Sequence, residues 1–385
     1  MKYGIIVFNE TINIGDDIQS YAALKRMPKV DYYIEREKMN EFISNNGENV
    51  KVLFSGWFLH NRYRFPPSPY IDPFFISCHF SSLDDSLGVS KEYISSYVIE
   101  YLKRYEPIGC RDTSTKKLLS EKGIDNYLSY CLTLTIPKFE GIKKENKVVL
   151  VDVPNGVKEK VNKEYSGNIE EITHTLDKKN NSKLSYEKRM ENVERLLKKY
   201  QSAEFVITTR LHCALPCLAL ETPVLFIYDD KNIDIINRIS DYIKFFDYCS
   251  LEEFLDKDLK KLFVKESRKD HIKIREDLIK RVEKFVNSDN KNNEKDYKLE
   301  MVKNLQHINE LAVIYEKNHR EYIEKFYSLE HDFVNMRYAK EYWEKEFNIL
   351  LSKYEKLKGK FEDSISKSET NSISKKRKNI NRRKK

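Results

Sequence analysis

The last third of the chain carries a seven-residue repeat, and this repeat limits what that region can fold into. From Met301 to Phe361, eighteen positions alternate at spacings of four and three residues, and sixteen of them are apolar or aromatic. Such a repeat predicts a left-handed coiled coil, about 90 Å long at 1.5 Å per residue. We therefore expect a coiled coil over residues 298–362 and a homo-oligomer held through residues 298–361.

Two features of the repeat leave its assembly open. The seam is rich in Tyr, Phe and Trp, so it is wider than a Leu/Ile zipper and does not fix the number of strands. A single long helix that folds back on the preceding lobes would show the same pattern. His319 and Lys340 interrupt the seam, and we interpret them as polar positions that set the register rather than as ligands.

The first 288 residues have a different texture, because short apolar runs alternate with amphipathic stretches as in an α/β fold. A length of 385 residues is enough for two to three domains. Two successive sets of strand–loop–helix units predict similar lobes at residues 1–140 and 141–288. A polar linker at 289–297 leads to the coiled coil, and a disordered basic tail is expected at 363–385.

Short runs rich in Val, Ile, Phe and Tyr are predicted to be strands buried on both faces of parallel sheets. They lie at residues 3–8, 50–54, 74–77, 148–153, 205–209 and 224–228. Helices are expected at residues 16–25, 113–122, 186–200, 214–220 and 265–287. Ligands of such sheets bind just past the carboxyl ends of the strands.

Composition excludes several classes of protein. Hydrophobic residues make up 40% and charged residues 34%, which is too polar for a uniform globule, whereas 12% aromatic residues is too many for a disordered chain. No stretch approaches 18 uninterrupted apolar residues, and the six cysteines form no CxxC pair. We expect a cytoplasmic protein with reduced thiols, in which Cys213 and Cys217 are small apolar residues on a buried helix face.

The net charge of +8 has one location. Residues 375–385, KKRKNINRRKK, contain eight basic residues and no acidic residue, so residues 1–374 are neutral in total. Such a segment can hold a protein at an anionic membrane, here the inner face, although a tail that only improves solubility would look the same. Nucleic-acid binding would rest on this tail alone and is not expected.

A first candidate ligand segment runs from Asn13 to Gln19, after the first predicted strand. Gly15 permits close approach of the backbone, and the exposed N–H groups at a helix start favour an anion. Asp16 and Gln19 also have the spacing of a capping box, which would explain both residues without a ligand.

A second candidate is Arg111, which precedes the helix expected at 113–122. The helix macrodipole opposes a cation at this position, so Arg111 needs an anionic partner. That partner is either an internal carboxylate, such as Asp112 or Asp16, or the phosphate or carboxylate of a ligand.

A third candidate is Arg210, which follows the strand expected at 205–209, with His212 two residues later. A guanidinium fork beside an imidazole offers an anion clamp next to a group able to give a proton near neutral pH. His60, His79 and His174 are further candidates for contact with substrate, although satisfied core histidines are the commoner case.

Several common motifs are absent from the sequence. It contains no GxGxxG after the first predicted strand, no GxxxxGK[ST], no GxSxG and no HExxH. Their absence argues against dinucleotide oxidation, P-loop phosphoryl transfer, serine hydrolysis and zinc proteolysis. No carboxylate cluster suggests a required metal.

Taken together, these residues resemble the polysaccharide pyruvyl transferase family over about residues 1–250. The resemblance rests on four motifs in order, which are Asn13-x-Gly15-Asp16, Gly56-Trp57-Phe58 with His60, Arg111-Asp112 with Ser114 and Leu118, and Arg210-Leu211-His212 with Pro223. Cys213 departs from the family pattern, where many relatives have glycine. The part before residue 289 is also short, which leaves the acceptor open.

The resemblance implies two Rossmann-like lobes that face a cleft, as in B-type glycosyltransferases. It also implies transfer of pyruvate from phosphoenolpyruvate, a co-substrate, onto two hydroxyls of one sugar as a cyclic ketal, with release of phosphate and with no metal or other cofactor. The acceptor would be a bacterial surface glycan, such as an exopolysaccharide or capsule, or its lipid-linked precursor.

The same resemblance assigns roles to the candidate residues. The donor-binding residues would be Arg111, Arg210, Leu211, Asn13 and Gly15. His212 would protonate the methylene carbon of the donor. Asp16 or Asp112 would accept a hydroxyl proton or orient neighbouring groups, and His60, His79 and His174 would contact the acceptor.

Two other functions remain compatible with the sequence. A nucleotide-sugar glycosyltransferase could use the same two lobes with a different donor. A non-catalytic assembly protein would instead place its function in residues 298–385.

Overall fold

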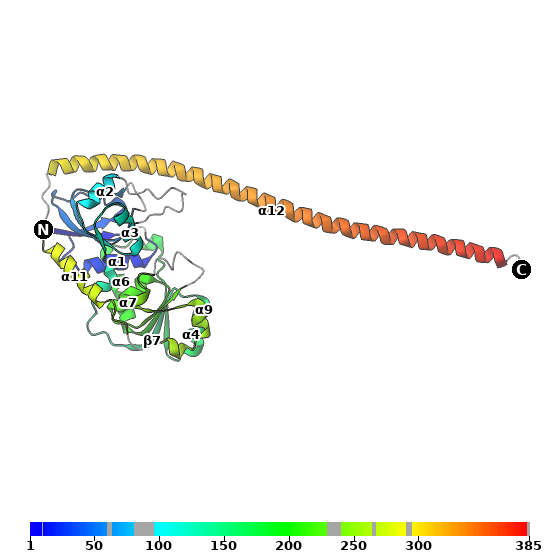
Figure 1. Ribbon diagram of the computed structural model, residues 1–385, viewed down its shortest axis with the longest axis horizontal. Helices are drawn as coiled ribbons and strands as arrows, with labels where there is room; N and C mark the ends of the chain where they lie inside the picture. The colour runs from blue at the N-terminus through cyan, green and yellow to red at the C-terminus, as the bar shows by residue number, and fades with distance from the viewer. Residues whose placement is uncertain are drawn as a thin grey trace. The chain divides into compact units, whose positions relative to one another are not determined.

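The computed structural model describes residues 1–9, 11–59, 64–80, 96–228, 240–263, 267–289 and 295–382. Its chain divides into two compact units, Met1–Asn309 and Glu310–Lys385. The first unit holds two parallel β-sheets with helices, and the second consists of the greater part of helix α12 (Figure 1). The predicted two-lobed α/β class with a long C-terminal helix is confirmed.

The first sheet has six parallel strands in the order β2-β1-β3-β4-β5-β6. Their bounds are Lys2–Val7 for β1, Tyr32–Glu35 for β2, Val50–Phe58 for β3, Ile71–Phe80 for β4, Ile108–Cys110 for β5 and Asn126–Leu128 for β6. The central strands β1, β3 and β4 are buried almost throughout, as the apolar runs predicted.

The second sheet has five parallel strands in the order β11-β10-β9-β7-β8. Their bounds are Glu145–Val151 for β7, Asn168–Ile172 for β8, Ala203–Thr208 for β9, Val224–Tyr228 for β10 and Asp247–Ser250 for β11. The sequence predicted β7, β9 and β10 but not the two edge strands. Edge strands are half-exposed and carry polar residues, such as the Glu170–Glu171 pair in β8, so they lack an apolar run.

Helices connect the strands and cover the sheets. Their bounds are Ile14–Leu24 for α1, Ser96–Lys103 for α2, Thr113–Glu121 for α3, Asn155–Glu164 for α4, Lys178–Asn181 for α5, Tyr186–Ser202 for α6, Leu211–Ala219 for α7, Leu251–Asp256 for α9, Leu259–Leu262 for α10 and Ile272–Val286 for α11. Short 3₁₀ helices lie at Arg36–Lys38 (η1), Leu132–Thr135 (η3) and Ile243–Phe245 (η4). The predicted capping box at Asp16 and Gln19 is wrong, because Asn13 caps α1 and both residues lie inside the helix.

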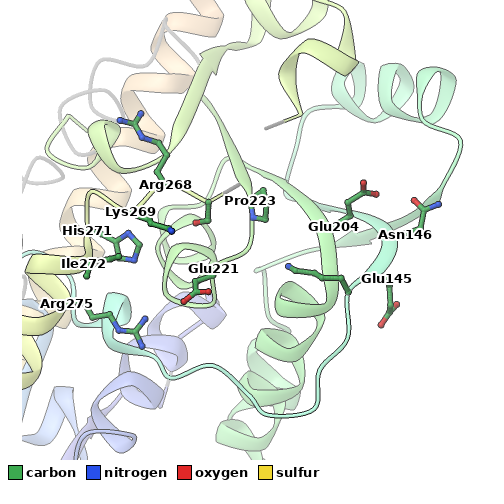
Figure 2. Close-up of a pocket in the computed structure, with 12 residues that line it drawn as sticks. Glu145, Asn146, Glu204, Glu221, Pro223, Arg268, Lys269, His271, Ile272 and Arg275 are labelled. Atoms are coloured by element: carbon green, nitrogen blue, oxygen red, sulfur yellow. The ribbon is translucent and has the colours of Figure 1, made fainter. Parts of the chain in front are cut away.

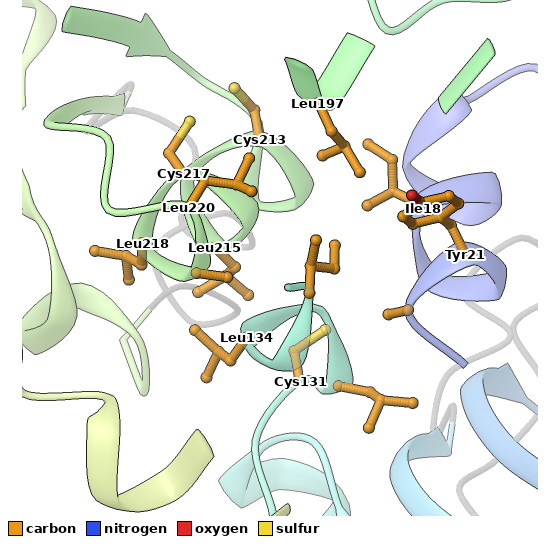
Figure 3. Packing of buried hydrophobic residues seen from close by; sticks show 14 of the residues in the cluster. Ile18, Tyr21, Cys131, Leu134, Leu197, Cys213, Leu215, Cys217, Leu218 and Leu220 are labelled. Carbon is orange, nitrogen blue, oxygen red and sulfur yellow. The ribbon is translucent and has the colours of Figure 1, made fainter. Parts of the chain in front are cut away.

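A single apolar core joins the two sheets. It contains residues of β1 and β3 from the first sheet and of β7, β9 and β10 from the second. Between them pack α1, η3, α6 and α7, from which Figure 3 shows Ile18, Leu134, Leu197 and Leu215 converging. Cys213 and Cys217 belong to this core as small buried residues, as predicted. The carboxyl ends of both sheets are therefore held in one compact unit.

Helix α12, Lys295–Arg382, begins in the first unit, where Val302 and Asn309 are buried. The structure describes α12 as far as Arg382, and the disordered basic tail expected at 363–385 stays a prediction. The interior of α12 contains no proline, and Gly359 is its only glycine, so nothing in the sequence interrupts it. Of the helices that the structure describes, none has the length and apolar character needed to cross a membrane.

Candidate active site

The start of helix α1 is tied to the second sheet by backbone hydrogen bonds. Asn13 forms an isolated antiparallel bridge with Thr175, and the N–H of Ile14 donates to the carbonyl of His174 at 2.9 Å. The Asn13 side chain accepts from the N–H of Gly15 at 3.0 Å, so it caps the helix. The segment predicted to bind a donor, which follows β1, is therefore joined to the residues that follow β8 of the second sheet.

Gly15 brings the first and third motifs into contact. A Cβ built on Gly15 would lie 2.9 Å from Nδ1 of His212 and 3.1 Å from Cβ of His212. Real Cβ atoms do not approach that closely, so only glycine lets the α1 backbone pack against the His212 side chain. His212 lies in the first turn of α7, immediately after Leu211, which packs against the shared core.

Arg111 lies directly after β5 and is 7% exposed. In the described part of the chain, its guanidinium donates to the Gln19 side-chain oxygen at 3.0 Å and lies 4.0 Å from a carboxylate oxygen of Asp112. A neutral amide and a distant carboxylate compensate a buried positive charge only in part. The Arg111 carbonyl accepts from the Tyr242 hydroxyl at 2.6 Å, which fixes the backbone from the second lobe.

Asp112 caps α3 and holds His79. One carboxylate oxygen accepts from the N–H of Thr115 at 2.8 Å, and the other lies 2.6 Å from Nδ1 of His79. Burial by itself would raise the pKa of Asp112, but the His79 hydrogen bond and the nearby Arg111 charge lower it well below its ordinary range. Asp112 is therefore a carboxylate hydrogen-bonded to His79, near the end of β4.

Asp16 belongs to the same network. Its carboxylate accepts from the Thr11 hydroxyl at 2.6 Å and from the Gln19 side-chain amide at 3.3 Å. Because Gln19 also accepts from Arg111, a chain of polar contacts connects Asp16 with Arg111. The structure thus brings Asp16 and Arg111 together through Gln19, a contact that the sequence did not reveal.

Arg210 occupies the N-cap position of α7, after β9. Its Nε donates to Asp152 at 2.7 Å, and its side chain is 44% exposed. Burial by itself would raise the pKa of Asp152, but hydrogen bonds from Thr173, the His174 backbone and Arg210 lower it. Asp152 follows β7 and adopts a positive φ of 50°, a conformation that is uncommon for a non-glycine residue.

His174 lies in the core rather than at a surface. It is 1% exposed, and its Nε2 lies 2.7 Å from the Tyr200 hydroxyl. Burial lowers the pKa of His174 to about 4, so the ring is neutral near pH 7. The predicted contact between His174 and an acceptor does not fit this burial. His60, which was also predicted to contact the acceptor, lies outside the described residues.

One residue of the candidate site was missed from the sequence, Asp152. It had a usable signal, since it directly follows an apolar strand at the edge where ligands bind. Gln19 lay in the first candidate segment but was interpreted as part of a capping box, and the tertiary structure shows instead that it accepts a hydrogen bond from Arg111. Among the described residues, no group of three or more His, Cys, Asp and Glu side chains is arranged to hold a metal ion.

A cavity of about 780 Å³ lies away from these residues, at the amino ends of β7, β9 and β10. Figure 2 shows Glu145, Glu204 and Pro223 on its wall, facing Lys269 and Arg275. Ligands of parallel sheets bind at the carboxyl ends of the strands, and that is where Arg111, Arg210 and His212 lie. We therefore place the candidate active site at the carboxyl edge and not in this cavity.

Three solved structures share the general architecture at low similarity. A UDP-GlcNAc 2-epimerase of Methanocaldococcus jannaschii is 12% identical, with a TM-score of 0.38 over 74% of this chain and 100% of that one. The heptosyltransferase WaaC of E. coli is 10% identical, with a TM-score of 0.31 over 65% and 93%. An uncharacterized Klebsiella pneumoniae protein is 11% identical, with a TM-score of 0.37 over 65% and 92%. At these scores they carry no argument about function.

Comparison of the sequence with known proteins and with family models identifies more than the comparison of structures does. No curated protein matches the chain. A model of the family described as polysaccharide pyruvyl transferase matches residues 13–231, which is more than half of the 385 residues. The match spans all four motifs and includes strands of both sheets. The chain therefore belongs to the polysaccharide pyruvyl transferase family.

Proposed function

We propose that this transferase moves pyruvate from phosphoenolpyruvate onto two hydroxyls of one sugar, forming a cyclic ketal and releasing phosphate. The observation that carries the proposal is Arg111, a buried guanidinium whose partners among the described residues are a neutral amide and a carboxylate 4.0 Å away. A buried cation of this kind is stabilised by an anionic ligand. Phosphoenolpyruvate has two anionic groups, so Arg111 and Arg210 can each bind one.

His212 is suited to the proton transfer that starts the reaction. It donates a proton to the methylene carbon of phosphoenolpyruvate, which leaves an oxocarbenium-like centre on the neighbouring carbon. The first sugar hydroxyl attacks that carbon and loses its proton. The carbon–oxygen bond to phosphate then breaks, and the second hydroxyl closes the ring. Of the two hydroxyl protons, one restores His212, and the other is taken up by a base that passes it to the departing phosphate.

His79 is the better candidate for the base that accepts a hydroxyl proton. Its Nδ1 is held by Asp112 at 2.6 Å, an arrangement that fixes the ring and stabilises its protonated form. Asp112 has a lowered pKa, so it is a poor base itself, and Asp16 is occupied by Thr11 and Gln19. We assign Asp112 an orienting role and Asp16 a role in holding Gln19 beside Arg111.

The test is phosphate release from phosphoenolpyruvate in the presence of candidate glycans, read together with the mass of a ketal adduct. Arg210→Ala and His212→Ala should abolish both signals without unfolding the protein. Arg268→Ala, at an exposed arginine beside the cavity of Figure 2, is the control that should retain activity. Undiminished turnover in Arg210→Ala or His212→Ala would contradict the mechanism.

Ligand-induced thermal stabilisation separates this function from the alternatives. Stabilisation by phosphoenolpyruvate but not by nucleoside diphosphates supports the pyruvyl transfer, and the reverse result favours a nucleotide-sugar glycosyltransferase. No stabilisation by either class, together with no turnover, would favour an assembly protein.

The acceptor and the place of reaction are part of the same proposal. We infer that the acceptor is a bacterial surface glycan, such as capsule or exopolysaccharide, or its lipid-linked precursor. The eight basic residues of 375–385 would hold the enzyme at the inner face of the membrane, with about 1 kcal/mol for each charge near an anionic leaflet. Co-sedimentation with anionic liposomes should fall when residues 375–385 are deleted, and unchanged co-sedimentation would leave only a solubilising tail.

A further inference from the structure

The second unit exposes a continuous apolar stripe. Nine seam positions between residues 326 and 357 are each 60–70% exposed. These are Phe326, Leu329, Phe333, Met336, Trp343, Phe347, Leu350, Tyr354 and Leu357. Together they expose on the order of 1,000 Å², which is comparable with the roughly 800 Å² that each partner buries in a standard protein–protein interface. A stripe of this size marks an interaction surface.

We propose that this stripe binds the same stripe of a second copy of the chain in an antiparallel pair, with Lys340 of each copy opposite Trp343 of the other. The occupant is a second copy because the chemistry of the stripe is complementary to itself when it is reversed. The proposal concerns α12 alone and does not depend on the reaction that the first unit catalyses.

The spacing of the seam determines which positions meet in an antiparallel pair. The seam alternates steps of three and four residues, and a reversed helix must match a step of three with a step of three. Positions that begin a step of three, such as Phe326, therefore face positions that end one, such as Leu357 of the second copy. In a parallel pair, by contrast, each position faces its own copy.

In the proposed register every layer joins unlike side chains. Phe326 faces Leu357, Leu329 faces Tyr354, Phe333 faces Leu350, and Met336 faces Phe347 of the second copy. Each of these layers combines one aromatic with one aliphatic side chain, so the layers have similar volumes. Even volumes allow the helices to keep a constant separation while they pack without voids.

Lys340 selects this register. Opposite Trp343, its ammonium group can lie over the indole ring in a cation–π contact. A parallel pair would instead place Lys340 against Lys340, where like charges repel. A shift of one heptad in either direction would face Lys340 with Met336 or Leu350 and would place Trp343 against Phe333 or Phe347, which loses the contact and crowds a layer.

The charges beside the seam are mostly consistent with the same register. In this register Arg337 lies opposite Glu344 of the second copy, and Asp332 lies opposite Lys353. The two charges in each of these pairs attract one another. Lys325 and Lys360 repel near the two ends of the paired segment. Exposed charge pairs contribute little each, so the layers rather than the flanks determine the orientation.

Disulfide trapping of the full chain tests the orientation directly. Met336→Cys and Phe347→Cys proteins are prepared separately, mixed and oxidised. Antiparallel pairing predicts a 336–347 disulfide between the two proteins and none within either protein alone, because two copies of residue 336 would be about 16 Å apart along the axis. Tyr338→Cys, on the outer face of the helix, is the control and should not crosslink. The six native cysteines are all buried in the first unit.

Crosslinking of Met336→Cys with itself would show a parallel pair and overturn the proposal. Light scattering gives an independent test, in which the wild-type chain should have the mass of two copies. Phe333→Asp should shift that mass to one copy, whereas Tyr338→Asp should not. A wild-type mass of one copy, or of three or more, would also overturn the proposal.

Discussion

The two halves of the candidate active site use the same residue types in opposite surroundings. Beside the first sheet, the Arg111 side chain is 9% exposed, while the more exposed His79 binds the carboxylate of Asp112. Beside the second sheet, the Arg210 side chain is 44% exposed and binds Asp152, while His174 is 1% exposed and binds a phenol. In the first half the carboxylate is held at hydrogen-bond distance by a histidine side chain, and in the second half by an arginine side chain.

This difference separates a fixed cation from an exchangeable one. Arg111 is held by burial, so a ligand finds its guanidinium already in position. Arg210 is held by an ion pair in which its own side chain is 44% exposed and that of Asp152 is 14% exposed, so a ligand anion can reach the guanidinium and compete with Asp152 for it. We infer that the first half positions the donor and that the second half adjusts to it.

The largest expected effect comes from removing either arginine. Arg210→Ala and Arg111→Ala should each lower kcat/KM for phosphate release by roughly 10²–10³-fold, since each removes a charged donor to the reacting group. Only Arg111→Ala should also lower the free energy of unfolding, by about 2–3 kcal/mol, because it leaves a cavity and an unsatisfied Gln19. Phosphate release and urea unfolding are measured for both variants. Equal free energies of unfolding would contradict the difference between a buried Arg111 and a partly exposed Arg210.

The pH dependence of stability should reveal the buried histidine. Burial lowers the pKa of His174 to about 4 in the folded protein, from an ordinary value of about 6.5. As pH falls, the unfolded chain therefore binds a proton on this residue before the folded protein does. His174 costs no stability above pH 6.5, but the cost rises to about 3 kcal/mol as pH falls toward 4. Urea unfolding across that pH range should show that the free energy of unfolding falls less for His174→Phe than for wild type. Parallel curves would show that His174 is not buried as described.

Close contact at Gly15 predicts a smaller effect. Gly15→Ala should lower stability by about 1–2 kcal/mol and reduce turnover, because the added methyl group would displace His212. Gly156→Ala is the matched control, since Gly156 also lies in the first turn of a helix but its Cβ would meet Leu255 at an ordinary 3.4 Å. Thermal unfolding and phosphate release are measured for both, and equal behaviour would contradict the Gly15–His212 contact.

The smallest effect is expected at the partly exposed ion pair of Arg210 and Asp152. Asp152→Asn should change stability by about 1 kcal/mol at pH 7, because the Arg210 side chain is 44% exposed. Since the folded pKa of Asp152 is lowered, its contribution is present above the unfolded pKa and is lost as pH falls through the folded one. The difference between variant and wild type should therefore shrink in acid, which unfolding measured from pH 7 down to 3 can test.

Much of the fold was predictable because buried strands carry a simple pattern. The central strands β1, β3, β4, β7, β9 and β10 are covered on both faces and consist of apolar runs. The strands that were missed are the four edges, β2, β6, β8 and β11, and the three-residue β5. Edge strands are defined by pairing on one side, and that pairing leaves little trace in a short polar segment.

The site was predictable to a similar extent. Arg111, Arg210 and His212 are recognisable because each is a charged or titratable residue directly after a strand. His174 has the same kind of sequence position and is nevertheless buried against Tyr200. Its burial depends on packing between segments that are far apart in the chain, and no local pattern reports it.

The sequence by itself determined the elements whose information is periodic or local: the central strands, the long helix with its apolar seam, the basic segment at 375–385 and the motifs that identify the family. Only the tertiary structure decided which polar groups meet. The contacts of Gly15 with His212, of Gln19 with Arg111 and of Asp112 with His79 join residues that lie 33 to 197 positions apart. Distances across folded strands and helices are set by the packing of the shared core, and it is those distances that turn separate motifs into one site.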